Sequence, residues 1–387
     1  MSHPPLRSII TPAAILRIVL GWATFLGLVA AGPLLEPPVP APVLITALTV
    51  IVGVILVCAF GVVHEAEHLA RRLGDPYGSL VLTLSIVMIE VILIAAVMLG
   101  PGEHATIARD SVMAVSMIIL NAVIGLSLLV GGLRHGGMRH NRTGTSAYLS
   151  LLVVLSALAL ALPALIGTGG SYTAGQVIPI IVLTLSLYVF FLFRQMGRQA
   201  ADFREVPAAP DQAPAAGEKR SLDDSARPRV TQVIARHRTE LVLRVAVLLV
   251  TVLPIVLLSH DMAALLDDGL GRVGAPAALA GILIAMIVFL PESITSIRAA
   301  LKAEVQRVSN LCHGALVSTV GLTIPAVLII GALTGQTVVL GESPANLLLL
   351  GVSLLLSITT FAAKRTTAMH GAAHLAVFGV YALVVFA

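Results

Sequence analysis

Long apolar segments recur along the whole chain, and they restrict the possible folds more than any other feature. Each is about 18 to 25 residues long, close to the length with which an α-helix crosses a bilayer. One of them, residues 78–99, reads GSLVLTLSIVMIEVILIAAVML and contains a single carboxylate, Glu90. Only 11% of all residues are charged, against about 25% in soluble domains. The sequence therefore predicts an all-α polytopic membrane protein.

We expect eleven transmembrane helices, and the charges of the loops support this number. The expected spans are residues 13–31, 43–63, 78–99, 110–133, 147–166, 174–193, 241–259, 277–297, 308–333, 345–363 and 370–387. With the N-terminus inside, 22 of the 24 Lys and Arg residues fall in the inner segments, and only Arg109 and Arg272 fall outside. Cytoplasmic loops of membrane proteins carry such an excess of basic residues. We expect a cytoplasmic N-terminus, an external C-terminus and no nucleic-acid partner.

One long loop divides the chain into two halves of five spans each. We expect an N-terminal transmembrane helix in residues 1–42, a first five-helix repeat in 43–195, a cytoplasmic linker in 196–240 and a second five-helix repeat in 241–387. The linker is rich in Pro and Ala with mixed charge, a composition that cannot bury a core. Because five is an odd number, corresponding helices cross in opposite directions. This is the inverted-repeat arrangement of many secondary transporters, whose binding site lies near mid-membrane between the repeats.

Two glutamates, one in each half, are the only acids deep inside the expected spans. Glu90 lies in span 78–99, and Glu292 lies in span 277–297. A charged group at bilayer depth is costly and is therefore usually functional. Helical spacing places Thr83 on the face of Glu90, and Thr295 and Ser296 on the face of Glu292. We expect both carboxylates to bind the same cation or protons, although each could instead be a protonated residue hydrogen-bonded within the bundle.

Three further polar residues in the spans are candidates for the same site. Asn121 and Ser318 lie in the spans that follow the two glutamates, and His313 is the best candidate for a proton relay. Carboxylate, amide and hydroxyl oxygens suit a hard cation such as Ca²⁺, which takes 6–8 oxygen ligands. The two cysteines, Cys58 and Cys312, both lie in apolar segments, so no disulfide framework is implied.

A second motif suggests a different chemistry. The stretch His64-Glu65-Ala66-Glu67-His68 matches the H-E-x-x-H pattern of zinc hydrolases, in which two histidines bind zinc and the glutamate activates water. At the end of a span, this pattern would suit an intramembrane metalloprotease. A third ligand is needed, and the best candidate, Asp267-Asp268, lies on the opposite side of the membrane. The alternatives are an amphipathic inner loop, or acids that attract cations to the inner mouth of a pathway.

Three stretches resemble the ChaA-type cation/proton antiporters of the calcium/cation antiporter superfamily. They are LARRLGDPYGSLVLTLSIVMIE, PESITSIRAALKAEVQRVSNL and the C-terminal GAAHLAVFGVYALVVFA. The resemblance implies an inverted-repeat fold of ten or eleven helices, with Glu90 and Glu292 as the repeat acids. Where the wider superfamily often has Gly-Asn before each acid, this chain has Ile86-Val87 and Val288-Phe289. One amide ligand per repeat is therefore missing.

These observations together predict a secondary transporter rather than an enzyme. We expect an antiporter in a bacterial cytoplasmic (inner) membrane that exports Ca²⁺, or Na⁺ or K⁺, in exchange for protons. Its partners would be inorganic cations, protons and the lipid bilayer, with no resident cofactor. Protons and a cation that compete for the same two carboxylates exclude each other, which is what antiport requires. A channel or uniporter without proton coupling, and the zinc protease, are the alternatives.

Overall fold

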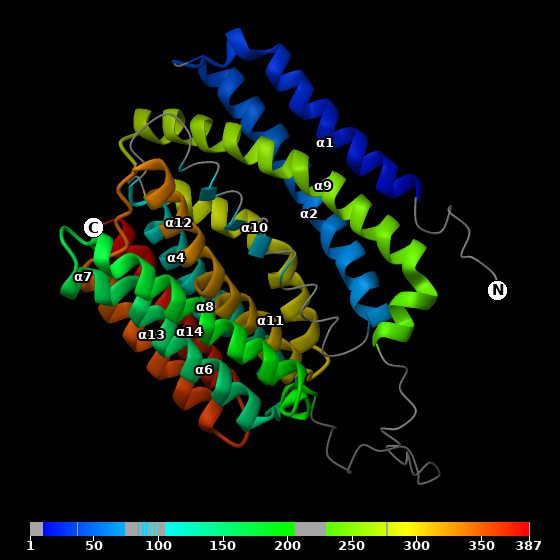
Figure 1. Ribbon diagram of the computed structural model, residues 1–387, viewed down its shortest axis with the longest axis vertical. Helices are drawn as coiled ribbons and strands as arrows, with labels where there is room; N and C mark the ends of the chain where they lie inside the picture. Colours follow the sequence, from blue (N-terminus) through cyan, green and yellow to red (C-terminus); the bar gives the residue numbers. More distant parts are fainter. Residues whose placement is uncertain are drawn as a thin grey trace.

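The protein is an all-α bundle in the part of the chain that is described. The computed structural model describes residues 11–36, 38–73, 105–205, 230–275 and 278–386, with single residues 84, 87, 88, 90, 91, 94, 95 and 98. Within these ranges the only β pairing is two isolated bridges, Met138–Thr366 and Thr168–Ser171. Nine helices of the described chain are long and apolar enough to cross a membrane. The predicted class, a polytopic α-helical membrane protein, is confirmed (Figure 1).

The helices follow the expected spans closely. In chain order they are α1 (Pro12–Ala30), η2 (Gly32–Leu34), α2 (Ala41–Leu73), α4 (Ile107–Met117), η3 (Ile118–Val123), α5 (Ile124–His135), α6 (Arg142–Ser156), η4 (Ala157–Ala161), α7 (Leu162–Ile166), α8 (Ala174–Met196), η5 (Ala200–Phe203), α9 (Val230–Arg272), α10 (Ala278–Ala300), α11 (Val305–Ser318), η8 (Thr319–Thr323), α12 (Ile324–Thr334), α13 (Pro344–Ala362) and α14 (Ala368–Val385). The described residues of the span 78–99 are all helical.

The predicted linker 196–240 is narrower than expected. Its first residues form η5, whose Phe203 packs against Tyr148 with ring centroids 5.1 Å apart. Its last eleven residues already belong to α9, which begins at Val230. The helix also runs on to Arg272, so residues 260–272 are helical where we expected an outer loop. The rest of the linker, 206–229, lies outside the described residues.

Two separate hydrophobic cores divide the described chain. One core joins α1, α2 and α9, with Ile51 and Cys58 of α2 packed among residues such as Ile255 and Met262 of α9. The other core holds the helices from α4 to α8 and from α10 to α14. Figure 1 shows α1, α2 and α9 running together along one side of the molecule. The cores do not coincide with the repeats, because α2 comes from the first half of the chain and α9 from the second.

A buried charge triad links α2 to α9 near one end of this smaller core. Arg244 Nη1 donates to Glu65 Oε2 at 2.6 Å, and Arg244 Nε donates to Glu240 Oε1 at 3.3 Å. All three residues are buried, with 3–6% of their surface exposed. Removing one partner of a buried ion pair leaves an uncompensated charge, which costs about 3–5 kcal/mol. The Arg244 triad therefore holds the two helices together.

We predict that Arg244→Ala lowers the stability of the protein strongly, by about 3–5 kcal/mol, because two buried carboxylates lose their shared cation. Arg272→Ala is the matched control, because Arg272 also lies on α9 and also pairs with an acid four residues earlier, Asp268. That pair is partly exposed, so its loss should cost at most about 1 kcal/mol. Thermal unfolding of both variants in detergent is the measurement, and equal melting temperatures would contradict the role of the triad.

The two halves of the larger core repeat the same architecture. In each half the third helix is interrupted by a π segment, η3 between α4 and α5 and η8 between α11 and α12. The last helix of each half packs against the second part of the interrupted helix of the other half, α14 against α5 and α8 against α12. A Cβ at Gly371 of α14 would lie 2.3 Å from the Leu129 nitrogen of α5, so this contact requires glycine. The arrangement agrees with two inverted repeats.

Candidate functional site

Glu90, from the first repeat, lies against the π segment of the second repeat. Thr319 is the first residue of η8, and its Oγ1 donates a hydrogen bond to Glu90 Oε2 at 2.5 Å. Glu90 is 4% exposed, and its Oε1 has no hydrogen-bond partner among the residues that the structure describes. One oxygen of this buried carboxylate therefore has no donor in the described part of the chain.

Glu292, from the second repeat, lies against the π segment of the first repeat. It is on α10 and lines a small cavity together with Ile119 and Val123 of η3. Cys312 and Ala315 of α11 complete this wall. Glu292 is 8% exposed, and its Oε2 accepts no hydrogen bond within the described part of the chain. This oxygen too is buried without a donor.

The two glutamates therefore occupy reciprocal positions. Each lies on the helix before its own interrupted helix and faces the π segment of the opposite repeat. π segments inside α-helices occur frequently at functional sites. A buried polar atom without a partner costs free energy, and an ionised carboxylate can only accept hydrogen bonds or bind cations. Each repeat thus contributes one carboxylate whose hydrogen bonds are incomplete among the described residues. Such a carboxylate is suited to bind a proton or a cation.

The hydroxyl residues that we expected around the glutamates take different places. Thr83 lies outside the described residues, and Thr295 is partly buried one turn after Glu292. Ser296 Oγ lies 3.5 Å from Cys312 Sγ, on the wall of the Glu292 cavity. Ser318 instead accepts a hydrogen bond from the Tyr188 hydroxyl at 3.0 Å. The structure thus brings Ser296 near the site and places Ser318 against α8.

Thr319 contacts Glu90, and sequence reasoning missed it. An α-helical count places the residue after Ser318 about 100° away from the expected face. The π segment that begins at Thr319 adds residues to the turn and changes the phase of the helix. The paired Gly-Leu patterns at Gly125 and Gly321 mark the same region of both repeats, but they do not reveal the π turn.

Asn121 binds the second repeat rather than the Glu292 cavity. Its Nδ2 donates to Ser353 Oγ at 2.8 Å, and its Oδ1 lies 3.3 Å from His374 Nδ1. Ile119 and Val123, on either side of it, line the cavity instead. Asn121 therefore links η3 to α13 and α14 in this conformation.

His313 lies deep in the larger core on α11, but its contacts lead away from Glu292. Its Nδ1 lies 2.9 Å from Ser309 Oγ, and its ring packs edge-on against Phe361 with centroids 5.0 Å apart. Its Nε2 has no hydrogen-bond partner among the described residues. Cys312, the preceding residue, lines the Glu292 cavity, and successive helical residues point about 100° apart. The relay role of His313 stays a prediction.

The H-E-x-x-H motif does not form a metal centre in the described part of the chain. His64 and His68 pack edge to face with ring centroids 4.6 Å apart. Glu65, which would have to activate water in a hydrolase, is bonded to Arg244. The residues that the structure describes contain no group of three His, Cys, Asp or Glu side chains that could hold a metal ion. Glu65 of this motif belongs to the Arg244 triad.

Comparison with known proteins identifies the family. Residues 43–197 and 243–387 match the family described as sodium/calcium exchanger protein. The chain is 31% identical over 335 residues to the sodium-potassium/proton antiporter ChaA of Escherichia coli, covering 86% of this chain and 87% of ChaA. It is 35% identical over 334 residues to y4hA of Sinorhizobium fredii, which is named as an ionic transporter, covering 86% of each chain.

Solved structures show the same fold. The structure of native YfkE superimposes with a TM-score of 0.68 at 18% identity, covering 96% of this chain and 99% of YfkE. The H⁺/Ca²⁺ exchanger CAX superimposes with a TM-score of 0.66 at 14% identity, covering 96% of this chain and 89% of CAX. The family match leaves out residues 1–42 and 198–242, which contain α1, η2, η5 and the beginning of α9. The chain therefore belongs to the sodium/calcium exchanger family within the calcium/cation antiporter superfamily, and it is a multi-pass secondary transporter rather than an enzyme.

Proposed function

We propose that this exchanger is an antiporter that moves Ca²⁺, or Na⁺ or K⁺, against protons. The observation that carries the proposal is the reciprocal placement of Glu90 and Glu292. Each is buried against the π segment of the other repeat, with one oxygen that has no partner among the described residues. The relatives support the class, since ChaA is named a sodium-potassium/proton antiporter and CAX an H⁺/Ca²⁺ exchanger.

The proposed chemistry uses the two carboxylates for both cargoes. Burial disfavours an ionised carboxylate, and a second negative charge close by disfavours it further. Without a cation, the site therefore binds protons. A cation neutralises the two carboxylates and displaces the protons, so the two cargoes alternate. Thr319 supplies a neutral oxygen beside Glu90, and Ser296 has a hydroxyl one helical turn after Glu292, and a hard cation takes such neutral oxygens as ligands.

The two hydrophobic cores suggest which part of the protein moves. Rocking one repeat against the other would separate α2 from α9, although these helices share a core and the Arg244 triad. We propose instead that α1, α2 and α9 move as one body against the larger core. The contacts of α10 with α2 and α9 then form the surface along which access changes from one side to the other.

The test of proton coupling is an ion-by-ion assay in everted membrane vesicles. A respiration-driven pH gradient is established, and Ca²⁺, Na⁺ or K⁺ is added separately. Collapse of the gradient by one of these ions, absent in vesicles without the protein, supports antiport and identifies the cation. Cation uptake that leaves the pH gradient intact would support a uniporter and contradict the proposal.

The same assay separates the transporter from the metalloprotease that the sequence motif suggested. We predict that His64→Ala combined with His68→Ala keeps most of the exchange rate, because the two rings pack against each other and Glu65 is bonded to Arg244. The control is the metal content of the purified wild type. Loss of exchange together with loss of a bound zinc ion would show that the motif holds a metal after all.

A further inference from the structure

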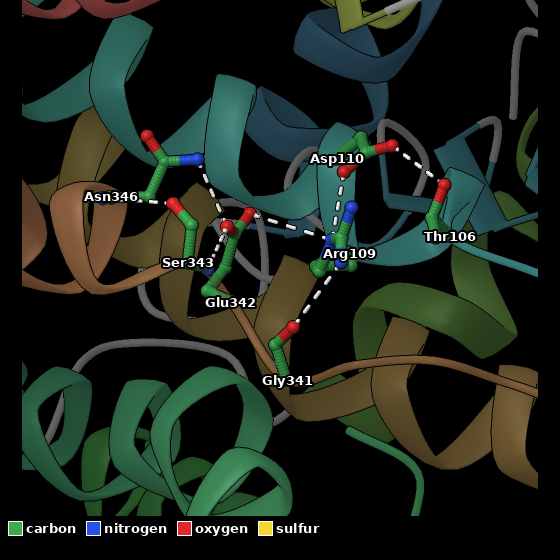
Figure 2. Close-up of polar contacts among 7 residues, drawn as sticks. All are labelled: Thr106, Arg109, Asp110, Gly341, Glu342, Ser343 and Asn346. Atoms are coloured by element: carbon green, nitrogen blue, oxygen red, sulfur yellow. Dashed lines mark hydrogen bonds and ion pairs between the residues drawn. The ribbon is translucent and has the colours of Figure 1, made fainter. Parts of the chain in front are cut away.

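A polar cluster joins the two repeats at the end of the bundle where α4 and α13 begin (Figure 2). Arg109 Nε lies 2.9 Å from Asp110 Oδ1 and 3.9 Å from Glu342 Oε1. Arg109 Nη1 donates to the Gly341 carbonyl at 3.3 Å, and Thr106 Oγ1 donates to Asp110 Oδ2 at 2.9 Å. Arg109 and Asp110 belong to the first repeat, and Gly341 and Glu342 precede α13 of the second. We call these contacts the α4–α13 seal.

Glu342 is the incompletely satisfied member of the seal. Its side chain is 2% exposed. Its Oε2 accepts hydrogen bonds from Asn346 Nδ2 and the Ser343 amide, both at 2.9 Å. Its Oε1 accepts none from the residues that the structure describes, because Arg109 Nε donates to Asp110 instead. An ionised carboxylate in this position has lost water without gaining a full set of donors, so the ionised form is costly.

The groups around Glu342 on balance favour its neutral form over its ionised form. Arg109 and Asp110 face it from α4, and the Tyr381 phenol of α14 lies near both carboxylates. Burial raises the pKa of the Glu342 carboxyl, the hydrogen bonds at Oε2 and the charge of Arg109 lower it, and Asp110 raises it, with a net upward shift. Glu342 therefore binds a proton more tightly when the seal is closed than when the side chain is in water.

The seal lies on a helix pair that is also joined deeper in the bundle. Asn121 follows Arg109 by twelve residues, and Ser353 follows Glu342 by eleven. Their side chains are hydrogen-bonded at 2.8 Å, about 16–18 Å along the helices from the seal at 1.5 Å per residue. The two contacts together fix the position of α4 and η3 against α13, and η3 borders the Glu292 cavity.

We propose that Glu342 makes the α4–α13 seal sensitive to protons, with a closed seal when Glu342 is neutral and a loosened seal when it is ionised. The sign follows from linkage, because the state that binds the proton more tightly is favoured as the pH falls. The corresponding contact at the other end, between α6 and α11, is an amide pair in which the Asn141 backbone donates to Gln306 Oε1 at 2.8 Å. That hydrogen bond does not titrate. The acid at that end, Glu205, instead accepts hydrogen bonds from the Gln306 and Arg307 amides at the start of α11.

Hydrogen exchange followed by mass spectrometry tests the seal directly, in the full chain in lipid nanodiscs with no ion gradient. Peptides covering residues 105–117 and 338–350 are followed between pH 5.5 and pH 9, after correction for the intrinsic pH dependence of exchange. We expect protection to fall by at least about fivefold as the pH rises, the lower range of typical coupling between two sites. Because no transport is measured, this result does not depend on whether the exchanger couples to protons.

Two variants and a control complete the experiment. Glu342→Gln imitates the neutral form and should keep high protection at every pH. Arg109→Gln removes the nearby positive charge, so protection should fall only at a higher pH than in the wild type. The control is Glu304→Gln, the same change in a partly exposed pair with Arg307 at the other end, which should leave the wild-type profile unchanged. Protection of the wild type that does not vary with pH, or a Glu342→Gln profile equal to the wild-type profile, would overturn the proposal.

Discussion

Glu90→Gln and Glu292→Gln are each expected to abolish cation-dependent proton movement while the protein remains folded. Glutamine keeps the size and one acceptor oxygen of glutamate. It has no negative charge, so it neither takes up a proton nor attracts a cation as a carboxylate does. Both side chains are buried, and each has one oxygen without a hydrogen-bond partner among the described residues, so the substitution removes the charge that we propose binds the cargo. A loss of about 100-fold in exchange rate corresponds to about 2.7 kcal/mol, within reach of one lost charged ligand.

The measurement is the initial rate of exchange in proteoliposomes that contain equal amounts of protein. Melting temperature and elution volume confirm that the variants are folded. Glu304→Gln is the control for a general effect of the substitution, since Glu304 lies at a helix end and is paired with Arg307. If either glutamine variant kept an exchange rate close to that of the wild type, the corresponding glutamate would have no part in binding the cargo.

The fold and the two acids could be predicted from the sequence because a bilayer restricts a chain so strongly. Apolar length reveals a spanning helix directly, and an acid in such a segment is conspicuous because it is costly there. The helical boundaries of α1, α8 and α13 agree with the expected spans to within about three residues, a usual uncertainty for helix ends. The same reasoning singled out Glu90 and Glu292, which the structure buries, and their role in binding stays a prediction.

The neighbours of the two acids could not be predicted, because they depend on local helical phase and on contacts across the repeats. Thr319, the first residue of a π segment, contacts Glu90, and no residue type specifies a π turn. Asn121 has the chemistry of a cation ligand, yet Ser353 and His374 occupy its amide. These partners lie more than 230 residues away in the chain.

The charged residues near the helix ends show a second limit of prediction from the sequence. The positive-inside pattern treats Arg244 only as a basic residue that orients a span, whereas the structure buries it between Glu65 and Glu240. Arg109 was one of only two basic residues on the expected outer side. Its unusual position was a signal, but counting charges in the loops could not show with which residues it pairs. Side chains that pair across the fold carry information that a charge count along the sequence does not contain.

Transport is expected to slow sharply at acid pH in a way that added cation reverses. The reason is the competition that follows from the proposed function, in which protons and the cation bind the same two carboxylates. If the two carboxylates form one buried site, as we propose, their negative charges cannot both persist without a counter-charge, so an empty site takes up protons as the pH falls. Each fall of one pH unit should then raise the apparent Michaelis constant for the cation by up to about tenfold per competing proton, while the maximum rate changes little.

The measurement is the initial exchange rate across a cation series at several pH values, made in proteoliposomes with equal pH on both sides. The Glu342→Gln variant is measured in parallel, because the α4–α13 seal would alter the rate even at saturating cation, whereas competition at Glu90 and Glu292 would not. If the maximum rate fell while the apparent affinity stayed constant in both proteins, protons would act at a distant group such as His313. A shared site requires the opposite result, because only a proton bound where the cation binds can be displaced by more cation.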